Sequence, residues 1–308
     1  MQTDLVLIDW LSITSKIHTK EQIVALLGME SASWTVTKGA HGYKDRLYYN
    51  CISIHYNGSP DQGVWLDMSG QGCRCFETVG HGDFDMLLQL VQDNPEQMKV
   101  TRMDVAYDDH SGILDLPQLC QDTRLQNYVA KATAWQVVES NKGAAVYIGS
   151  QQSEVLIRIY DKAAERNITD GTHWVRVEMQ LRRDRALEFS KLPGTIGERY
   201  AGVLVNYLRY VEPDLHDSNK RRWALTDYWA TLIGSAAAIS IYTKPGLEYN
   251  VLRCENYVYK QAGNAIDALI KCYGQDKFFD KLQKRSARPN PKYSHMVEDF
   301  LRGCTVDG

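Results

Sequence analysis

The stretch Val100-Thr-Arg-Met-Asp-Val-Ala-Tyr-Asp108 alternates polar and apolar side chains, and this alternation decides the expected fold. Successive side chains of a β-strand point to opposite faces of its sheet. Asp104 and Asp108 therefore share one face, while Val105 and Tyr107 share the other. The stretch predicts a strand with one polar face and one face that can be buried.

Two later stretches, residues 156–162 and 174–182, show the same alternation. If the three strands share a sheet, one face is apolar and the other combines carboxylates, a phenol and several cations. A solvated sheet face is the ordinary explanation of such a pattern, and it stays open here. Arginine and tyrosine beside isolated acids are, however, better suited to phosphate and a divalent cation. The later stretches add these polar-face residues: Arg158, Tyr160, Lys162, Arg176, Glu178, Gln180 and Arg182.

The first half of the chain repeats the order of elements in the second. The first half has strand-like runs at 5–11, 46–50, 51–56 and 64–68. The second half has corresponding runs at 100–107, 135–139, 144–148, 155–161 and 174–181, and helix-like runs lie between the strands in both halves. Three landmarks match: Asp9 with Asp104, Tyr56 with Tyr160, and Asp67 with Glu178. The repeat predicts an α+β fold of two tandem βαβββα-like units, a duplicated antiparallel sheet with helices on one face.

Helical spacing dominates after residue 200, apart from a possible strand at 238–242. We therefore expect the chain to form three structural regions. Residues 1–95 form a first α+β unit, residues 96–200 form a second α+β unit that carries the catalytic motifs, and residues 201–308 form a mainly helical C-terminal region.

The polar face suits phosphodiester transfer. Asp104 and Glu178 supply hard oxygen ligands of the kind that Mg²⁺ or Mn²⁺ prefers. Tyr160 can attack phosphorus directly, provided that a nearby cation favours its phenolate. Arg158, Lys162 and also Arg176 are then expected to stabilise the charge of the transition state.

The 308 residues include 35 Lys and Arg against 38 Asp and Glu, a formal charge of −3, so any contact with nucleic acid must be local. No apolar run is long enough for a membrane span and no signal peptide begins the chain, so we expect a cytoplasmic protein without membrane contact. Basic clusters are candidate DNA contacts, with a solvated helix face as the alternative for the later one. The candidates are Arg182, Arg183, Arg185, Lys281, Lys284 and Arg285.

Three motifs resemble those of the Rep_trans replication initiators of rolling-circle plasmids and filamentous phages. They are Thr101-Arg-Met-Asp-Val-Ala-Tyr-Asp-Asp109, Ile157-Arg-Ile-Tyr-Asp-Lys162 and Trp174-Val-Arg-Val-Glu-Met-Gln-Leu-Arg182. The segments Ile8-Asp-Trp-Leu-Ser12 and Leu66-Asp-Met-Ser-Gly-Gln-Gly-Cys-Arg74 resemble the phage branch of this family. The similarity spans roughly the first 190 residues and continues more faintly beyond them.

The resemblance implies an origin-specific DNA nickase and religase. Tyr160 matches the family's nucleophile, which would form a 5′-phosphotyrosine and leave a free 3′-OH. Asp104 and Glu178 match the metal-binding acids, and Asp9 is the candidate third ligand, with Asp108 behind it. A homodimer and a host helicase are expected by analogy with the family.

Other functions remain open at this point. A nickase that holds its metal on a His-x-His pair is disfavoured, because none of the eight histidines forms such a pair. A non-enzymatic origin-binding regulator could keep the fold without the chemistry. A metal-dependent nuclease could use water in place of Tyr160 as the attacking group.

Overall fold

Ten strands form one antiparallel sheet in the computed structural model, which describes residues 4–141, 143–238, 258 and 263–285. The sheet order is β2-β3-β4-β5-β1-β6-β11-β10-β9-β8. The first five strands in the chain are β1 (Leu5–Ser15), β2 (Thr35–Lys38), β3 (Asp45–Tyr49), β4 (Ile52–Tyr56) and β5 (Val64–Met68). The others are β6 (Met98–Asp109), β8 (Trp135–Ser140), β9 (Gly143–Ile148), β10 (Val155–Asp161) and β11 (Val175–Arg182).

The strand order reads in the same way outward from the centre. The long strands β1 and β6 pair antiparallel in the middle, and each is followed outward by four strands in reverse chain order. This arrangement confirms the predicted α+β fold with a duplicated antiparallel sheet. The sequence did not indicate β2, because most of its side chains are exposed and show no apolar alternation.

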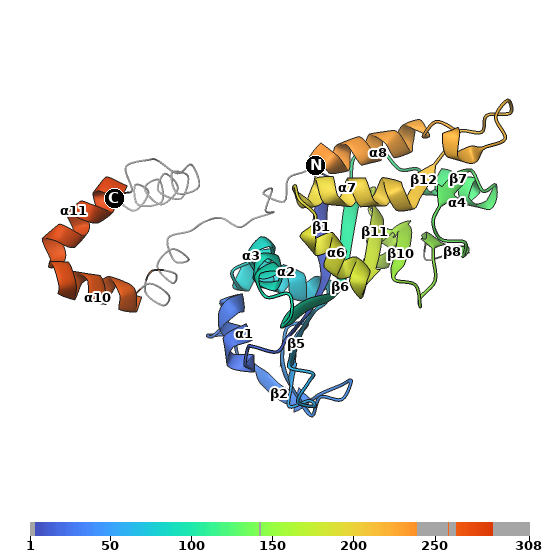
Figure 1. Ribbon diagram of the computed structural model, residues 1–308. Helices are drawn as coiled ribbons and strands as arrows, with labels where there is room; N and C mark the ends of the chain where they lie inside the picture. Colours follow the sequence, from blue (N-terminus) through green and yellow to red (C-terminus); the bar gives the residue numbers. More distant parts are fainter. Residues whose placement is uncertain (1–3, 142, 239–257, 259–262, 286–308) are drawn as a thin grey trace. The chain divides into compact units, whose positions relative to one another are not determined.

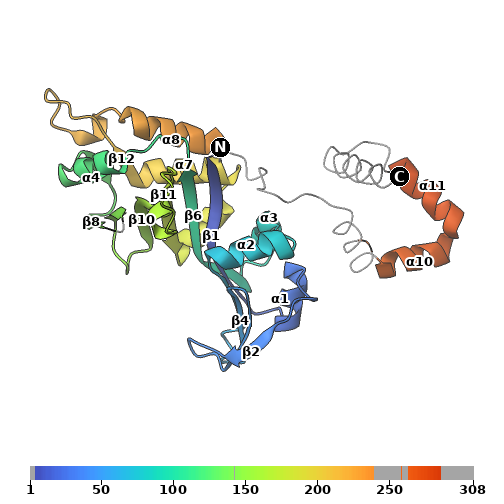
Figure 2. The same cartoon turned by 180° about the vertical axis from the view of Figure 1, so that it is seen from behind.

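Helices cover one face of this sheet. In the first half they are α1 (Lys20–Leu27), α2 (Gly70–Val79) and α3 (Phe84–Asp93). In the second half they are α4 (Leu116–Arg124), α6 (Asp184–Lys191) and α7 (Ile196–Tyr207), while α8 (Asp227–Ala238) packs against α7 and the short α5 (Lys162–Glu165) directly follows β10. Figures 1 and 2 show α6 and α7 on the same side of the second-half strands.

The apolar core lies between the helices and the strands. Val105 and Tyr107 of β6 are fully buried in it, as are Ile159 of β10 and Met179 of β11. Tyr200 of α7 also enters the core and donates a 2.7 Å hydrogen bond from its hydroxyl to the carbonyl oxygen of Val177. The expected apolar face is therefore the face that the helices bury, and the polar alternates point away from them.

The start of α2 shows why its sequence is rich in glycine. A Cβ atom on Gly72 would lie 2.3 Å from the carbonyl oxygen of Cys51, so only glycine lets the helix approach this turn. Helix α1 is set by a capping box, in which the Thr19 hydroxyl and the Gln22 side chain each accept a backbone N–H of the other residue.

The chain divides into two compact units, Met1–Lys244 and Pro245–Gly308. The described part of the second unit contains α10 (Gly263–Tyr273) and α11 (Gln275–Arg285). The predicted boundaries of the two α+β units and the C-terminal region, at residues 95 and 200, stay a prediction. Within the described residues, every helix is too short or too polar to cross a lipid bilayer.

The described residues after 200 are mainly helical, as predicted, with one exception. Residues 208–210, expected to be helical, form β12 (Leu208–Tyr210), which pairs with β7 (Tyr128–Ala130), and η1 (Lys220–Arg222) follows. The helical prediction was wrong there because a three-residue strand is too short to show a period of two. The possible strand at 238–242 lies outside the described residues, except that residue 238 ends α8.

Replacing Tyr200 by phenylalanine tests how α7 is held to β11. We expect Tyr200→Phe to lower the free energy of unfolding by about 1–2 kcal/mol, because the buried Val177 carbonyl loses a donor. Urea unfolding followed by circular dichroism measures this loss. Tyr207→Phe, on the same helix but only partly buried, should change stability by less than about 0.5 kcal/mol, and equal losses in both variants would contradict the prediction.

Candidate active site on the uncovered sheet face

Strand register brings the predicted polar residues together. Arg158 of β10 lies opposite Glu178 of β11, and Tyr160 lies opposite Arg176. Arg176 in turn lies opposite Asp108 of β6. Residues that oppose each other on neighbouring strands share a face, so this cluster occupies the face that the helices leave uncovered. The sequence predicted this shared face correctly from the alternation alone.

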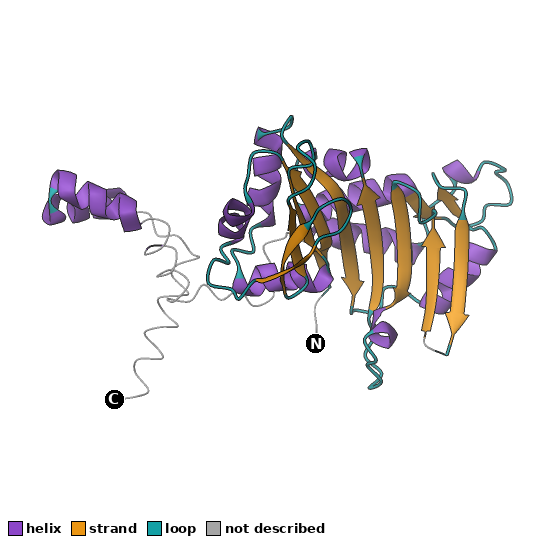
Figure 3. Ribbon diagram, turned by 90° about the horizontal axis from the view of Figure 1, so that it is seen from below, coloured by secondary structure: helices purple, strands orange, loops and turns teal. Residues whose placement is uncertain are grey.

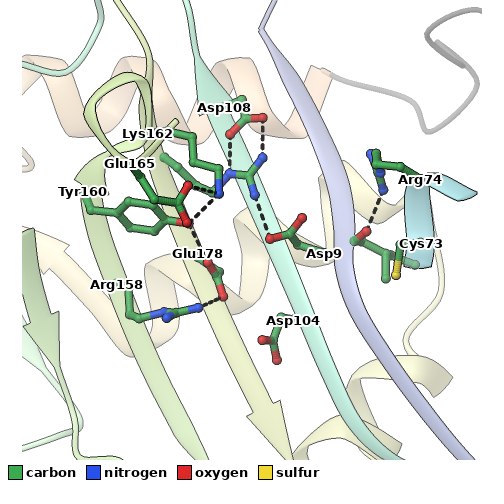
Figure 4. A network of polar contacts seen from close by, with 12 residues as sticks. Asp9, Cys73, Arg74, Asp104, Asp108, Arg158, Tyr160, Lys162, Glu165 and Glu178 are labelled. Carbon is green, nitrogen blue, oxygen red and sulfur yellow. Dashed lines mark hydrogen bonds and ion pairs between the residues drawn. The ribbon is translucent and has the colours of Figure 1, made fainter. Parts of the chain in front are cut away.

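The phenol of Tyr160 sits between a carboxylate and an ammonium group (Figure 4). Its Oη donates a 2.9 Å hydrogen bond to Glu178 Oε2, and Lys162 Nζ donates to the same Oη over 3.4 Å. Arg158 forms an ion pair with the other Glu178 oxygen. Burial, and then the charge of Glu178, raise the pKa of Tyr160 above its ordinary value of 10. The phenol is therefore protonated here and its proton points to Glu178.

Lys162 reaches the phenol because the strand ends just before it. Asp161 caps the short helix α5 by accepting a 2.8 Å hydrogen bond from the backbone N–H of Ala164. Lys162 is the first residue of this helix, is only 3 % exposed, and forms an ion pair with Glu165. The sequence predicted Lys162 on the polar face but did not indicate its partner Glu165.

Arg176 is enclosed by two carboxylates from different strands. It donates to Asp108 through Nε and Nη2, at 2.5 and 2.7 Å, and to Asp9 Oδ2 through Nη1 at 2.7 Å. Burial opposes its charge, but the hydrogen bonds and charge of Asp108, together with the charge of Asp9, raise the pKa of Arg176 overall. Its guanidinium thus ties β11 to β6 and to β1, and its donors are directed to these acids.

A β-bulge in β1 brings Asp9 onto the polar face. The register with β6 shifts between Ile8 and Trp10, so Asp9 has no residue directly opposite it. Arg74 of α2 donates a 2.7 Å hydrogen bond to the Ile8 carbonyl oxygen at this bulge. Gly70 allows the close approach, since a Cβ atom there would lie 2.8 Å from Asp9 Oδ1. The sequence did not indicate the bulge, because residues 5–8 before it are all apolar and show no alternation in which a shift of one residue could be seen.

Asp104 is a second buried carboxylate on β6, besides Asp108. Arg102 donates to both of its oxygens, at 3.0 and 2.6 Å, and Gln180 of β11 donates to Oδ2 over 3.2 Å. Burial raises the pKa of Asp104 from 3.8 to about 6, against the opposing effect of Arg102, and the charge of Glu178 adds to the rise. Trp10 stacks beneath the Arg102 guanidinium, with 3.8 Å between the guanidinium carbon and the ring centroid.

The predicted metal ligands do not all come together. Asp9 faces Arg176 rather than Asp104 and Glu178, and the alternative ligand Asp108 is held by the same arginine (Figure 4). Within the described part of the chain, no three His, Cys, Asp or Glu side chains are grouped as a metal site. Asp104 and Glu178 still fit Mg²⁺ or Mn²⁺, because such ions often use one or two carboxylates and complete their shell with substrate phosphates and water.

The first half of the sheet carries a counterpart of this cluster without its chemistry. Asp67 lies opposite Ser53 and Trp65 lies opposite His55, as Glu178 lies opposite Arg158 and Arg176 opposite Tyr160. The His55 and Trp65 rings stack 4.5 Å apart, at the place that Tyr160 and Arg176 occupy in the second half. Tyr56 points to the other face and joins the apolar core, so its predicted equivalence to Tyr160 was wrong by one residue.

The candidate DNA-binding cations lie in both units. Arg182 donates to the Gln151 carbonyl oxygen, Arg183 is exposed before α6, and Arg185 contacts Glu154 over 3.4 Å. In α11, Lys281 lies 3.6 Å from the centroid of the Tyr273 ring and Lys284 forms an ion pair with Asp280 at 2.8 Å, while Arg285 ends the helix. Their contact with DNA stays a prediction.

Comparison with known proteins identifies the family of this chain. The sequence profile described as "Replication initiation factor", the Rep_trans family, matches residues 98–285, more than half of the chain. The chain belongs to this family. A second profile, "Rolling Circle replication initiation protein N-terminal domain", matches residues 5–90, so the two profiles cover the two halves of the sheet.

Two relatives each match about four-fifths of this chain. A rolling-circle replication initiator protein from Geobacillus stearothermophilus, whose structure is solved, has a TM-score of 0.71 and 27 % identity, and the match covers 78 % of this chain and 98 % of that one. The "Putative DNA relaxase NicK" of Bacillus subtilis is 24 % identical over 263 residues, 79 % of this chain and 74 % of its own length.

Loss of Arg176 should destabilise this protein strongly. Arg176→Met leaves Asp108 and Asp9 without their cation, and we expect the free energy of unfolding to fall by about 3–5 kcal/mol. Urea unfolding measures the change. The exposed pair of Arg124 and Glu139 is the control, since Arg124→Met should cost less than about 1 kcal/mol. Similar losses in the two variants would show that the buried arginine has no special role.

The raised pKa of Asp104 predicts a distinct pH dependence of stability. Because the folded state holds the Asp104 proton up to a pH of about 6 and the unfolded state releases it near 3.8, this group stabilises the fold most below pH 4. Its contribution should decline by on the order of 1–3 kcal/mol as the pH rises from 4 to 7.

Urea unfolding of the wild type and of Asp104→Asn across this range, in EDTA, isolates that contribution. The stability difference, wild type minus variant, should fall as pH rises, although other carboxylates titrate in both proteins. A difference that is constant or that grows with pH would contradict the assignment.

Proposed function

We propose that this protein is a rolling-circle replication initiator that nicks origin DNA and rejoins it through a covalent 5′-phosphotyrosine at Tyr160, with Mg²⁺ or Mn²⁺ as cofactor. One observation carries the proposal. The Tyr160 phenol donates to a buried carboxylate, Glu178, and accepts from Lys162 on an uncovered face that bears the motifs of the family. The relatives described as an initiator and as a DNA relaxase support the same activity.

The proposed nicking step uses the hydrogen bonds around the phenol. Tyr160 Oη forms a bond to the scissile phosphorus while its proton passes to Glu178 Oε2, which already accepts it at 2.9 Å. The bond from phosphorus to the 3′ oxygen breaks, and that oxygen takes a proton from the Lys162 ammonium group, whose nitrogen lies 3.4 Å from Oη. Religation is the reverse, with the 3′ oxygen as nucleophile and the phenolate as leaving group.

Arg158 is the cation best suited to the phosphate. Its side chain is 31 % exposed, so a phosphate can reach it, whereas its Nε is buried and has no hydrogen-bond partner among the described residues. Arg176 acts instead as a positioning residue, since its donors are held by Asp108 and Asp9. A divalent cation held by Asp104 and Glu178 would supply further charge stabilisation for the phosphate.

The partners and the setting follow from the same proposal. The substrate is origin DNA, supercoiled or single-stranded at the nick site, in the cytoplasm of a bacterial host. A homodimer and a host helicase complete the proposed assembly, by analogy with the family.

Replacing the proposed nucleophile tests the reaction. We expect Tyr160→Phe to abolish both the nick and the covalent protein–DNA adduct, because only the hydroxyl oxygen can attack phosphorus. The assay uses supercoiled DNA carrying the element's own origin with Mg²⁺ or Mn²⁺, followed by agarose and denaturing protein gels. Tyr56→Phe, which alters the buried tyrosine of the first half, should nick and form the adduct like the wild type.

Two other outcomes would replace the proposal. Cleavage that persists in Tyr160→Phe without any protein-linked DNA would indicate a hydrolytic nuclease that uses water. Origin binding that survives EDTA, with no strand breakage by the wild type in any divalent metal, would indicate a non-enzymatic regulator.

A further inference from the structure

The uncovered face continues past Tyr160 to the free edge of the sheet. In one row, Tyr147 of β9 lies opposite Arg158, and Gln136 of β8 lies opposite Tyr147. In the next row, Ala145 lies opposite Tyr160 and Val138 lies opposite Ala145. We call Tyr147, Gln136, Ala145 and Val138 the edge strip.

Several features leave the edge strip open to a ligand. Gln136 is exposed and Val138 is 39 % exposed, while Tyr147 and Ala145 are partly exposed. The helices that pack on this half of the sheet lie on the other face (Figure 3). Ala145, which lies opposite Tyr160, has a side chain too short to cover the phenol ring from the side of β9. The strip is therefore a surface that leads directly to the phenol.

Charge distinguishes the two directions away from Tyr160. Toward the first half, the uncovered face carries the ion pairs of Arg176 with Asp108 and Asp9 and of Arg102 with Asp104 and, beyond them, Asp67. Toward the edge, none of the four residues of the edge strip is acidic, and Arg158 stands at its start. A polyanion bound at Tyr160 therefore meets no carboxylate on the strip, whereas in the other direction it meets ion pairs whose cations already have partners.

We propose that a single-stranded DNA segment adjoining the scissile phosphate lies across the edge strip, with one of its bases stacked on Tyr147. This inference rests on the proposed function, because Tyr160 defines where the DNA chain begins. Aromatic side chains bind single strands by stacking on bases without requiring a particular sequence. Tyr147 is the aromatic member of the strip, one strand from the Tyr160 strand and directly opposite Arg158.

Binding to a single-stranded oligonucleotide tests the role of Tyr147 without any cleavage. In a Tyr160→Phe background and in EDTA, we expect Tyr147→Ala to weaken binding of a fluorescein-labelled origin strand by roughly 5- to 100-fold in fluorescence anisotropy. Tyr147→Phe keeps the ring and should bind within about twofold of its parent. Tyr48→Ala is the matched control, since Tyr48 lies on the same face of β3, opposite Ser53 in the first half.

Photo-crosslinking locates the strand independently of affinity. With p-benzoylphenylalanine in place of Gln136, we expect a crosslink to nucleotides within a few positions of the nick site. The same probe in place of Thr35, an exposed residue of β2 on the same face at the opposite edge, should give none.

The outcomes separate this inference from the proposed function. Equal crosslinking at the two edges, or unchanged binding by Tyr147→Ala, would overturn the edge strip as the DNA path even if Tyr160 is the nucleophile. Loss of binding in Tyr147→Phe as well would overturn stacking as its basis. If the wild type fails to nick, the proposed function is refuted, while binding and crosslinking still report on the strip.

Discussion

The buried ion pairs of Arg176 are the interaction on which the rest of the site depends. One guanidinium group on β11 binds Asp108 of β6 and Asp9 of β1, and so connects three neighbouring strands at the centre of the sheet. Burying these charges is costly unless every partner is present, which makes the arrangement sensitive to the β1 bulge that brings Asp9 within reach. Tyr160 lies directly opposite Arg176 on the neighbouring strand, so the same ion pairs fix the strand segment beside the phenol.

Duplication of the fold and divergence of its two halves explain why one half carries the candidate chemistry. The two halves pair through β1 and β6 and repeat the same strand order outward. In the second half the equivalent positions hold Tyr160 and Arg176, whereas in the first they hold the stacked rings of His55 and Trp65. The first half thus keeps its half of the sheet and the acids Asp9 and Asp67, and the second half adds Asp104, Asp108, the phenol, Lys162 and the uncharged path to the sheet edge.

Much of this could be predicted from the sequence because a strand alternates with a period of two. The alternation in β6, β10 and β11 placed Tyr160, Arg158 and Glu178 on one face, as observed. The period-two alternation gives no correct prediction where a strand has too few residues or where its register shifts by one residue. The edge strand β2 and the three-residue β12 were missed, the Asp9 bulge was not visible, and Tyr56 was matched to Tyr160 although its neighbour His55 holds that position.

The sequence by itself determined the class of fold, the family motifs and the faces of the main strands, since these depend on local periodicity and residue type. Only the tertiary structure decided which residues are partners. Pairing between strands fixes that Arg176 meets Asp108 and Asp9, that Glu178 accepts the Tyr160 proton, and that Tyr147 stands opposite Arg158. The physical reason is that register and bulges arise from contacts between segments up to 167 residues apart, which no local pattern encodes.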